Sequence, residues 1–394
     1  MSTDCPVCGG AETRPFFALR GVPVHCNRLH PTRAQALAAP TGDLRLHFCG
    51  GCGHVFNAAF DPALVSYAPD YENSLHFSAS FDAYARGLAM DLIERHDCRG
   101  KQVVEIGCGQ GDFLRLLCDL GGNRGLGFDP SHRPAPGAAA GNPTIVAEHF
   151  TAQNGSCAAD LVCCRHVLEH IAAPLPFLRE LRRALDRHAG PLVFFEVPNA
   201  AFTLYELGVW DLIYEHCGYF GSHSLSHAFR AASFEVLRVG DAFGKQFLTI
   251  EAVPGAAFAS PAPAPATALP GELHRAVEDF AARFRERVDH WNARLGGPGG
   301  DAASAPRRPV VWGAGSKGVS FLNATIAGSR VQYVVDINPR KHGKFVAGAG
   351  QQIVPAELLR DYRPDLVIVM NPAYGDEIRA RLESLGVRAR VESV

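Results

Sequence analysis

The stretch VVEIGCGQGDFL, residues 103–114, decides the fold of the central part of the chain. The apolar residues at its start are typical of a buried strand, and Gly107, Gly109 and Gly111 predict a tight turn that leads into a helix. Such a turn lets a ligand approach the backbone and meet the positive end of the helix. Strand and helix patterns alternate from about residue 74 to residue 253. We therefore expect an α/β protein whose central domain is a doubly wound sheet.

Two acidic residues near this glycine turn indicate the kind of ligand. Glu105 precedes the glycines, and Asp129 ends the next predicted strand in GLGFDPS, where a carboxylate can accept hydrogen bonds from ribose hydroxyls. Together they favour an adenosine-type ligand. A NAD site has the spacing GxGxxG, whereas the E-x-G-x-G-x-G spacing resembles motif I of the class I S-adenosylmethionine (SAM) methyltransferases. The resemblance implies a Rossmann-like core that binds SAM through Glu105, Gly107, Gly109, Gly111 and Asp129.

The segment LVCCRHVLEHI, residues 161–171, also resembles that superfamily in the strand and loop that line the methyl-donor cleft. His166, Glu169 and His170 have the spacing that places side chains on one face of a helical turn. Three interpretations stay open. The residues bind a catalytic metal, or His166 packs against adenine while His170 faces the substrate, or they cap a helix and face solvent. We expect at least one of them to contact cofactor or substrate.

Proton-transfer groups are clustered in DLIYEHCGYFGSHSL, residues 211–225. The connection after the strand LVFFEVPN is long enough to bring Tyr214, Glu215 and His216 over the methyl-donor site. Histidine titrates near neutrality and is the usual general base, and a neighbouring carboxylate or phenol sets its tautomer or shares its proton. A strand would place Tyr214 and His216 on one face and Glu215 on the other. The alternative is a structural cluster in which His216 bonds to backbone.

Two CxxC pairs near the start of the chain predict a metal site. Cys5 and Cys8 lie in CPVCGG, and Cys49 and Cys52 lie in FCGGCGH. Four thiolates on two tight turns form the tetrahedral set that structural Zn²⁺ prefers, and they leave no open position for a substrate. The alternative is that these cysteines are redox-active or incidental. We expect a small zinc-stapled domain.

Two linkers rich in small residues and proline divide the rest of the chain, VPGAAFASPAPAPATALPGE at residues 253–272 and GGPGGDAASAPRRP at residues 296–309. Between them, apolar residues at spacings of three and four predict an amphipathic helix over residues 273–295. The predicted domains are residues 1–70 for zinc binding, residues 71–255 for the SAM-binding core, and residues 256–394 for the linker helix and a smaller α/β unit with three strands.

The smaller unit has a glycine motif of its own in VVWGAGSKG. Gly313, Gly315 and Gly318, with Asp336 at the end of the next strand, satisfy the dinucleotide fingerprint. This motif supports a rival interpretation, a NAD-dependent oxidoreductase. The other interpretations are a turn that binds the nucleotide of the substrate and a turn that is purely structural.

The order of these motifs over essentially the whole chain resembles the three-domain sugar C-methyltransferases, which make branched deoxysugars. The resemblance implies that SAM methylates carbon 3 of a nucleotide-linked 4-keto deoxysugar. It implies a zinc-bearing N-terminal domain, a class I core and a Rossmann-like C-terminal domain that closes over the substrate. In that domain the glycine turn would lie near phosphate, and Lys317, Arg340 or Lys341 would supply positive charge.

The resemblance also assigns catalytic roles. His216, in the family's Glu-His pair, would remove the carbon 3 proton, while Tyr214 or His170 steadies the enolate oxygen. Tyr71 in DYENS would also reach the active site. One departure is that the tyrosine of the family falls at Ile213, which leaves Tyr214 in the place of an acid.

Composition limits the other possibilities. Lys and Arg number 38 against 40 for Asp and Glu, so no basic field favours a nucleic acid or a membrane surface as partner. The start of the chain lacks a signal-peptide pattern and no long apolar run follows, so we expect a cytoplasmic protein, monomeric or homodimeric. The remaining alternatives are an O- or N-methyltransferase of a related small molecule and a non-catalytic module that binds SAM or a nucleotide.

Overall fold

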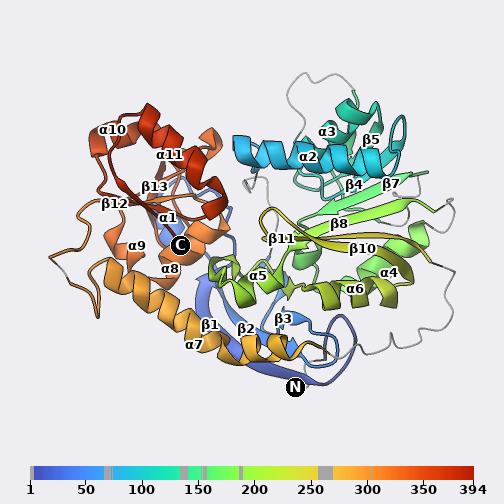
Figure 1. Ribbon diagram of the computed structural model, residues 1–394, viewed down its shortest axis with the longest axis horizontal. Helices are drawn as coiled ribbons and strands as arrows, with labels where there is room; N and C mark the ends of the chain where they lie inside the picture. The colour runs from blue at the N-terminus through green and yellow to red at the C-terminus, as the bar shows by residue number, and fades with distance from the viewer. Residues whose placement is uncertain are drawn as a thin grey trace.

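The computed structural model describes residues 4–65, 72, 74–133, 141–151, 153, 158–185, 190–255, 269–301 and 303–394. It contains three sheets, of four, seven and five strands. Figure 1 shows the five-stranded unit facing the seven-stranded unit, with the strands of the N-terminal sheet beneath both. No helix in the described part of the chain is long and apolar enough to cross a membrane.

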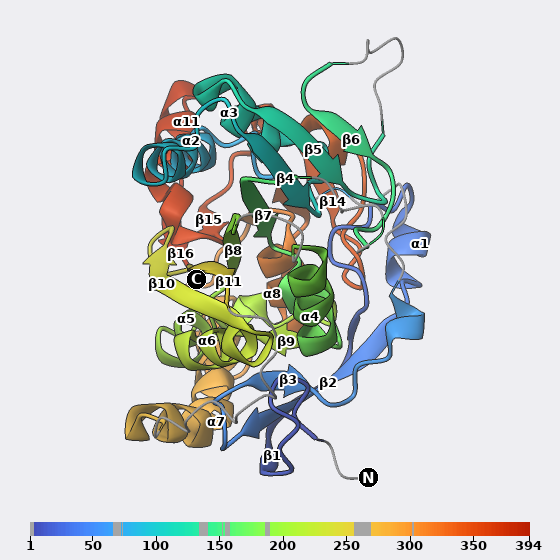
Figure 2. The ribbon, with the colours of Figure 1, turned by 90° about the vertical axis from the view of Figure 1, so that its right-hand side faces the viewer.

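The N-terminal sheet is antiparallel and takes its last strand from a distant part of the chain. Its order is β1 (Thr13–Pro23), β2 (Thr41–Cys49), β3 (Val55–Asn57) and β9 (Gly218–Tyr219). The short helix α1 (Arg33–Leu37) connects β1 to β2. Because Val55 pairs with Tyr219 in this sheet, the stretch of residues 211–225 that contains the predicted proton-transfer groups is tied to the N-terminal unit (Figure 2).

The central sheet is the predicted doubly wound one. Its order is β10-β11-β8-β7-β4-β5-β6, and only β11 runs antiparallel to the others. The order reverses between β4 and β7, and ligands of such sheets bind at the carboxyl ends of the strands at this switch point. The strand bounds are β4 Gln102–Ile106, β5 Arg124–Phe128, β6 Thr144–Val146, β7 Leu161–Arg165, β8 Leu192–Pro198, β10 Phe234–Ala242 and β11 Phe247–Pro254.

Alternate residues of the central strands face opposite layers of helices. Val103 packs with the layer of α2 and α3, whereas Val104 packs with the layer of α4 and α6. Both faces of the sheet are therefore apolar, as a parallel sheet requires. The helices of this unit are α2 Ala79–Arg95, α3 Asp112–Gly121, α4 Pro174–Ala184, α5 Ala200–Tyr205 and α6 Ser222–Ala231, with one-turn 3₁₀ segments at Pro62–Leu64, Leu168–His170 and Val209–Asp211.

The C-terminal unit is a parallel five-stranded sheet of order β14-β13-β12-β15-β16. The sequence predicted three strands, which are β12, β13 and β15, and the prediction missed the two short edge strands. The bounds are β12 Pro309–Trp312, β13 Tyr333–Val335, β14 Gln352–Val354, β15 Leu366–Val369 and β16 Arg390–Ser393, with α8 Ser316–Ala324, α9 Ala327–Arg330, α10 Leu359–Tyr362, α11 Gly375–Ser384 and 3₁₀ turns at Pro339–Lys341, Ala356–Leu358 and Pro372–Tyr374.

The predicted amphipathic helix is α7 (Gly271–Arg294), and it joins the N-terminal and C-terminal units (Figure 1). The Phe280 ring lies 5.1 Å from that of Phe17 in β1, and the Trp291 ring lies 5.4 Å from that of Phe321 in α8. Both contacts belong to one buried apolar cluster. The predicted domain boundaries remain predictions, since residues 66–71 and 256–268 lie outside the described part.

Candidate active site

A cavity of about 590 Å³ lies between the carboxyl ends of the central strands and the glycine turn of the C-terminal sheet. The predicted site residues that line it come from both units. They are His166, His170 and His216 on one side and Gly313, Gly315, Lys317, Gly318, Asp336 and Lys341 on the other. The structure thus brings together residues that are as much as 175 positions apart in sequence, from His166 to Lys341.

The first glycine turn lies beside this cavity rather than in its lining. A Cβ on Gly107 would lie 2.2 Å from a methyl carbon of Val167, the neighbour of His166. The Gly109 N–H donates to Asp129 at 2.8 Å, and the Ser131 N–H donates to the same carboxylate at 2.8 Å. Because a Cβ on Gly109 would meet no heavy atom within 4 Å, this side of the turn is open to a ligand.

Glu105 is buried in β4 beneath the turn. One of its carboxylate oxygens has no hydrogen-bond partner in the described part of the chain. Burial raises the pKa of this carboxyl to about 7, although nearby Arg165 lowers it. Glu105 therefore sits below the ligand face and carries a proton for part of the time at neutral pH.

A buried charged network joins the carboxyl ends of β7 and β8. Arg165 donates to one Glu196 oxygen at 2.8 and 3.0 Å, His166 Nε2 lies 2.9 Å from that oxygen, and Tyr84 donates to the other. Burial alone would raise the pKa of Glu196, but Arg165 and His166 outweigh this effect and lower the pKa to about 2. His166 has a φ of 56°, in the left-handed region that few residues other than glycine adopt. The network holds its ring against the cavity.

Glu169, His170 and His216 converge at the cavity wall. Each offers one ligand-type atom, and these atoms lie within 4.8 Å of one another. The His170 and His216 rings have centroids 4.9 Å apart in an edge-to-face arrangement. Burial lowers the pKa of each imidazole to about 3 and raises the pKa of Glu169 to about 8. At neutral pH both imidazoles are therefore neutral, and Glu169 is mostly protonated.

Two hydrogen bonds to backbone define the tautomers of these imidazoles. His170 Nδ1 lies 2.9 Å from the Glu215 carbonyl oxygen, which can only accept, so Nδ1 carries the proton and Nε2 keeps its lone pair. His216 Nδ1 is buried without a partner among the described residues, so the bond between its ring and the Asp211 backbone falls to Nε2. His216 thus presents the Nδ1 lone pair as a proton acceptor.

Tyr214 and Glu215 lie outside the cavity lining. The Tyr214 hydroxyl accepts from the Asp61 N–H at 2.8 Å, and its ring packs on Phe60. The Glu215 carboxylate accepts from the Cys26 N–H at 2.8 Å. The predicted arrangement, with Tyr214 beside His216 at the substrate, is therefore not what the structure has. The cause is that this segment forms turns rather than a strand, so strand alternation does not apply to it.

The second glycine turn repeats the arrangement of the first. The Ala314 N–H and the Asn338 N–H each donate to Asp336 at 2.8 Å. Lys341 Nζ lies 3.8 Å from the same carboxylate, and Lys317 Nζ lies 2.6 Å from Gln246 and 3.3 Å from Asp211. Arg340 pairs instead with Glu72 at 3.1 Å and does not line the cavity.

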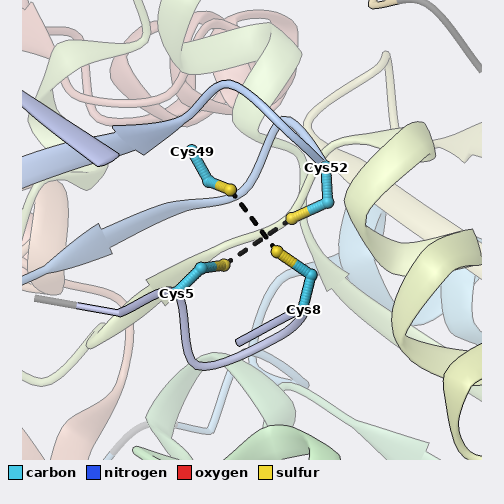
Figure 3. A group of neighbouring side chains, drawn as sticks. All are labelled: Cys5, Cys8, Cys49 and Cys52. Atoms are coloured by element: carbon cyan, nitrogen blue, oxygen red, sulfur yellow. Dashed lines mark hydrogen bonds between the residues drawn. The ribbon is translucent and has the colours of Figure 1, made fainter. Parts of the chain in front are cut away.

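The four predicted metal-ligating cysteines meet at one point (Figure 3). The Sγ atoms of Cys5 and Cys52 are 3.6 Å apart, and those of Cys8 and Cys49 are 3.5 Å apart. All four Sγ atoms lie within 4.8 Å of one another, a set compact enough for one tetrahedral ion with Zn–S bonds of about 2.3 Å.

Two family models match the chain over its two α/β units. Residues 81–239 match the methyltransferase domain, and residues 266–389 match the C-methyltransferase C-terminal domain. The chain is a SAM-dependent methyltransferase. The prediction of a methyltransferase domain followed by a C-methyltransferase C-terminal domain is confirmed. The rival interpretation as an oxidoreductase is not supported, because the C-terminal unit matches a C-methyltransferase domain.

Similar proteins cover part of this chain. The ubiquinone biosynthesis O-methyltransferase of Burkholderia thailandensis is 26% identical over 171 residues, which are 39% of this chain and 72% of the relative. Magnesium protoporphyrin IX methyltransferase of Synechocystis with bound SAM is 18% identical, with a TM-score of 0.33, over 45% of this chain and 80% of that one. The 1,6-didemethyltoxoflavin-N1-methyltransferase of B. thailandensis is 18% identical, with a TM-score of 0.34, over 44% of this chain and 80% of that one.

The residues at the first turn of the methyltransferase fit SAM. A Cβ on Gly109 would meet no heavy atom within 4 Å, Asp129 directly follows β5 at the position whose acid accepts from ribose hydroxyls in folds of this kind, and α3 begins at Asp112 without a side-chain cap on its N–H groups. Gly107 touches Val167, so a ligand on this turn would lie next to the His166 loop. These residues would hold the cofactor beside the cavity.

Several cavity residues of the methyltransferase were not singled out from the sequence as site residues. Asn371 and Met370 follow β15 at its carboxyl end, a position that marks ligand contacts in parallel sheets, and that signal was available. Others lie in segments without a motif. They are Asn27, Ser74 and Gln246 in loops and turns, and Glu377 and Arg381 in α11. Glu169 was predicted only as a member of the His166, Glu169 and His170 group, for which three interpretations stayed open, and the predicted Tyr71 lies outside the described residues.

Proposed function

We propose that this methyltransferase methylates carbon 3 of a nucleotide-linked 4-keto deoxysugar. One observation carries the proposal. A single cavity has neutral imidazoles on the wall nearest the first glycine turn, where SAM is proposed to bind, and the second glycine turn on the opposite wall. A substrate that fills it needs a reacting end and a phosphate-like end, and a nucleotide-linked sugar has both.

His216 is the proposed base. Carbon 3 becomes acidic because the carbonyl at carbon 4 stabilises the negative charge, and the neutral His216 accepts the proton at Nδ1. The His170 ring packs against His216 and bonds to the Glu215 carbonyl, so it positions the base. When bound, SAM supplies the methyl group that the carbon receives.

Glu169 is the proposed donor to the enolate oxygen. The Tyr214 hydroxyl lies outside the cavity, and the His170 proton is held by the Glu215 carbonyl. Glu169 lines the cavity, and burial raises the pKa of its carboxyl to about 8, so it can donate a hydrogen bond at neutral pH. A buried acid that stays neutral for this purpose is an established way to stabilise an enolate.

The C-terminal turn is proposed to bind the nucleotide end. Gly315 is open, since a Cβ there would meet only Asn27 at 3.9 Å, and α8 begins at the next residue, Ser316. Its N–H groups and the cavity side chains of Lys317 and Arg381 suit a diphosphate. Lys341 neutralises Asp336 beneath the turn.

Mass spectrometry of the purified protein with SAM and a panel of nucleotide-linked 4-ketosugars in deuterated water tests this proposal. We expect a product heavier by one methylene, formation of S-adenosylhomocysteine, and deuterium at carbon 3 when SAM is omitted. Both activities should be lost in His216→Gln and kept in His223→Gln, a histidine outside the cavity. A methyl group on oxygen or nitrogen, or SAM binding without turnover on any substrate, would overturn the proposed reaction.

We also propose that Cys5, Cys8, Cys49 and Cys52 hold a structural Zn²⁺. After a brief chelator treatment that removes weakly bound ions, elemental analysis should give one zinc per chain for the parent protein and for Cys118→Ser, and less than one for Cys8→Ser. Because the ion joins residues 5–8 to 49–52, its loss should lower the unfolding temperature of the Cys8 variant. Retention of a full equivalent of zinc in Cys8→Ser would contradict the assignment.

A further inference from the structure

The cluster of Glu169, His170 and His216 has the composition of a second metal site. Two imidazoles and one carboxyl place their ligand-type atoms within 4.8 Å of one another. Glu169 is 2% exposed and His216 is 8% exposed. Both Glu169 oxygens and His216 Nδ1 lack a hydrogen-bond partner among the described residues. Buried polar atoms usually have a partner, so these atoms point to a group that binds between them.

The hydrogen bonds behind the cluster are those that orient metal-binding histidines. Such a histidine donates from one ring nitrogen to a carbonyl or carboxylate and binds the ion with the other. His170 Nδ1 bonds to the Glu215 carbonyl oxygen at 2.9 Å, and the His216 ring bonds to the Asp211 backbone. His170 Nε2 and His216 Nδ1 therefore keep their lone pairs on the side where Glu169 lies, with His170 Nε2 4.0 Å from its Oε1.

The neighbouring groups make this cluster distinct from the rest of the cavity. His166 is held by Glu196 at 2.9 Å, and its Nδ1 is 3.9 Å from Glu169. The cationic side chains Lys317 and Lys341 lie with Asp211 and Asp336. An ion at the cluster would thus have two nitrogen ligands and one oxygen ligand, with its remaining positions facing the cavity.

We propose that Glu169, His170 and His216 bind a divalent transition-metal ion, Zn²⁺ or Co²⁺, and that an ion bound there stops methyl transfer. Two imidazoles and one carboxylate are a known ligand set for such ions, and nitrogen and oxygen donors separate this site from the four thiols near the N-terminus. The proposed inhibition rests on the proposed function, because an ion would occupy the lone pair of His216 and prevent Glu169 from donating to the substrate oxygen.

Titration of the zinc-loaded protein with Co²⁺, without substrate, tests the site itself. We expect one further Co²⁺ per chain, with visible d–d absorption and no intense thiolate-to-cobalt band. Glu169→Gln and His216→Gln should each weaken this binding at least about tenfold. Glu377→Gln is the matched control, because Glu377 lines the same cavity but bonds to Ser78 and Ser80. Its Co²⁺ stoichiometry should not change.

No further Co²⁺, or binding that Glu169→Gln and His216→Gln leave intact, would overturn the site. SAM binding and far-ultraviolet circular dichroism of each variant show that it is folded. The binding result does not depend on whether the ketosugar proposal holds.

Measurements of turnover test the proposed inhibition. With any substrate that the protein methylates, activity should fall in proportion to Co²⁺ or Zn²⁺ occupancy of this site. A brief chelator treatment that leaves one zinc per chain should restore it. Unchanged or increased turnover at full occupancy would overturn the claim that an ion bound at this site stops methyl transfer.

Discussion

The two glycine turns of this methyltransferase are built alike, but they are surrounded by different chemistry: the second turn lines the cavity, and the first lies beside it. In each, an acid at the end of the second strand accepts from a turn N–H and from the residue two positions later: Asp129 from Gly109 and Ser131, and Asp336 from Ala314 and Asn338. The turn geometry is therefore a general solution for holding a ligand. It does not by itself say what happens to that ligand.

The surroundings make the difference. Next to the first turn lie buried groups with strongly shifted pKa values, among them Glu105, Glu169 and His216. Next to the second turn lie two lysines paired with aspartates, Lys317 with Asp211 and Lys341 with Asp336. Shifted proton affinities mark reacting groups, whereas paired cations suit binding of an anion. We call the side of the cavity next to the first turn the first wall and the side next to the second turn the second wall. We expect the first wall to determine kcat and the second wall to determine KM.

Substitution of the proposed base tests this division most strongly. His216→Gln should lower kcat about 100- to 10,000-fold, because general base catalysis typically contributes that much. Its KM and its affinity for SAM should stay near those of the parent protein. Steady-state kinetics and calorimetric titration of SAM measure the two effects.

The matched change on the second wall is Arg381→Gln. Arg381 lines the cavity and forms an ion pair with surface-exposed Glu357, so the loss of its charge should leave the fold intact. We expect KM for the nucleotide-linked substrate to rise about tenfold or more, as for the loss of a charged hydrogen bond, with kcat nearly unchanged. Equal losses of kcat in the two variants would break the comparison.

Removal of the buried charge beside the first turn should have the next largest effect. Glu196→Gln leaves Arg165 buried without its partner, so we expect a loss of about 3–5 kcal/mol in the free energy of unfolding at pH 7. Asp336→Asn, beside the second turn, should cost less, about 1–3 kcal/mol, because its partner Lys341 lies farther away, at 3.8 Å. Urea denaturation measures both.

The pH dependence of this loss has a definite sign. The pKa of Glu196 is lowered from 4.5 to about 2, since Arg165 and His166 outweigh the effect of burial. A carboxyl whose pKa is lower in the folded state stabilises it above the unfolded pKa and loses this effect as pH falls. The difference between parent and Glu196→Gln should thus be constant above about pH 5 and shrink from pH 4.5 toward pH 2. A difference that grows on acidification would contradict the charge network.

The smallest expected effects come from the glycines, and they sharpen the comparison. Gly107→Ala would place its Cβ 2.2 Å from Val167, and Gly318→Ala would place its Cβ 2.0 Å from the Gly313 carbonyl oxygen. Each should destabilise the fold by about 1–3 kcal/mol through overpacking. Gly107→Ala should weaken the binding of SAM, and Gly318→Ala should weaken the binding of the nucleotide-linked substrate. Calorimetric titration with each ligand measures both affinities, and a variant that lost affinity for both ligands would contradict the comparison.

The sequence predicted those parts that depend on local patterns. The turn at Gly107, the two CxxC pairs and the alternation of strands and helices are each encoded within a few residues, and the structure contains all of them. The place of the Asp129 carboxylate beside the first glycine turn was also predictable, because the residue directly follows a predicted strand.

The residues that escaped prediction depend on distant contacts. Tyr214 was placed at the active site by its neighbours in sequence, yet its partner is Asp61, 153 positions away. The strand β9 has only two residues, and it exists because β3 is beside it. Glu169 and His216 are separated by a long connection, and only the fold shows that they meet. Such contacts have no signature in a single sequence.

The pairing of β9 with β3 also bears on how this protein can change. His216 lies between two attachments to the N-terminal unit, the bond from the Cys26 N–H to Glu215 before it and the pairing of Gly218 with Phe56 after it. The module that carries the cysteines therefore holds the proposed base, while a different module carries the turn proposed to bind SAM. An insertion, deletion or domain exchange within the first 60 residues is in effect a mutation of the active site, so the two modules must be inherited and engineered together.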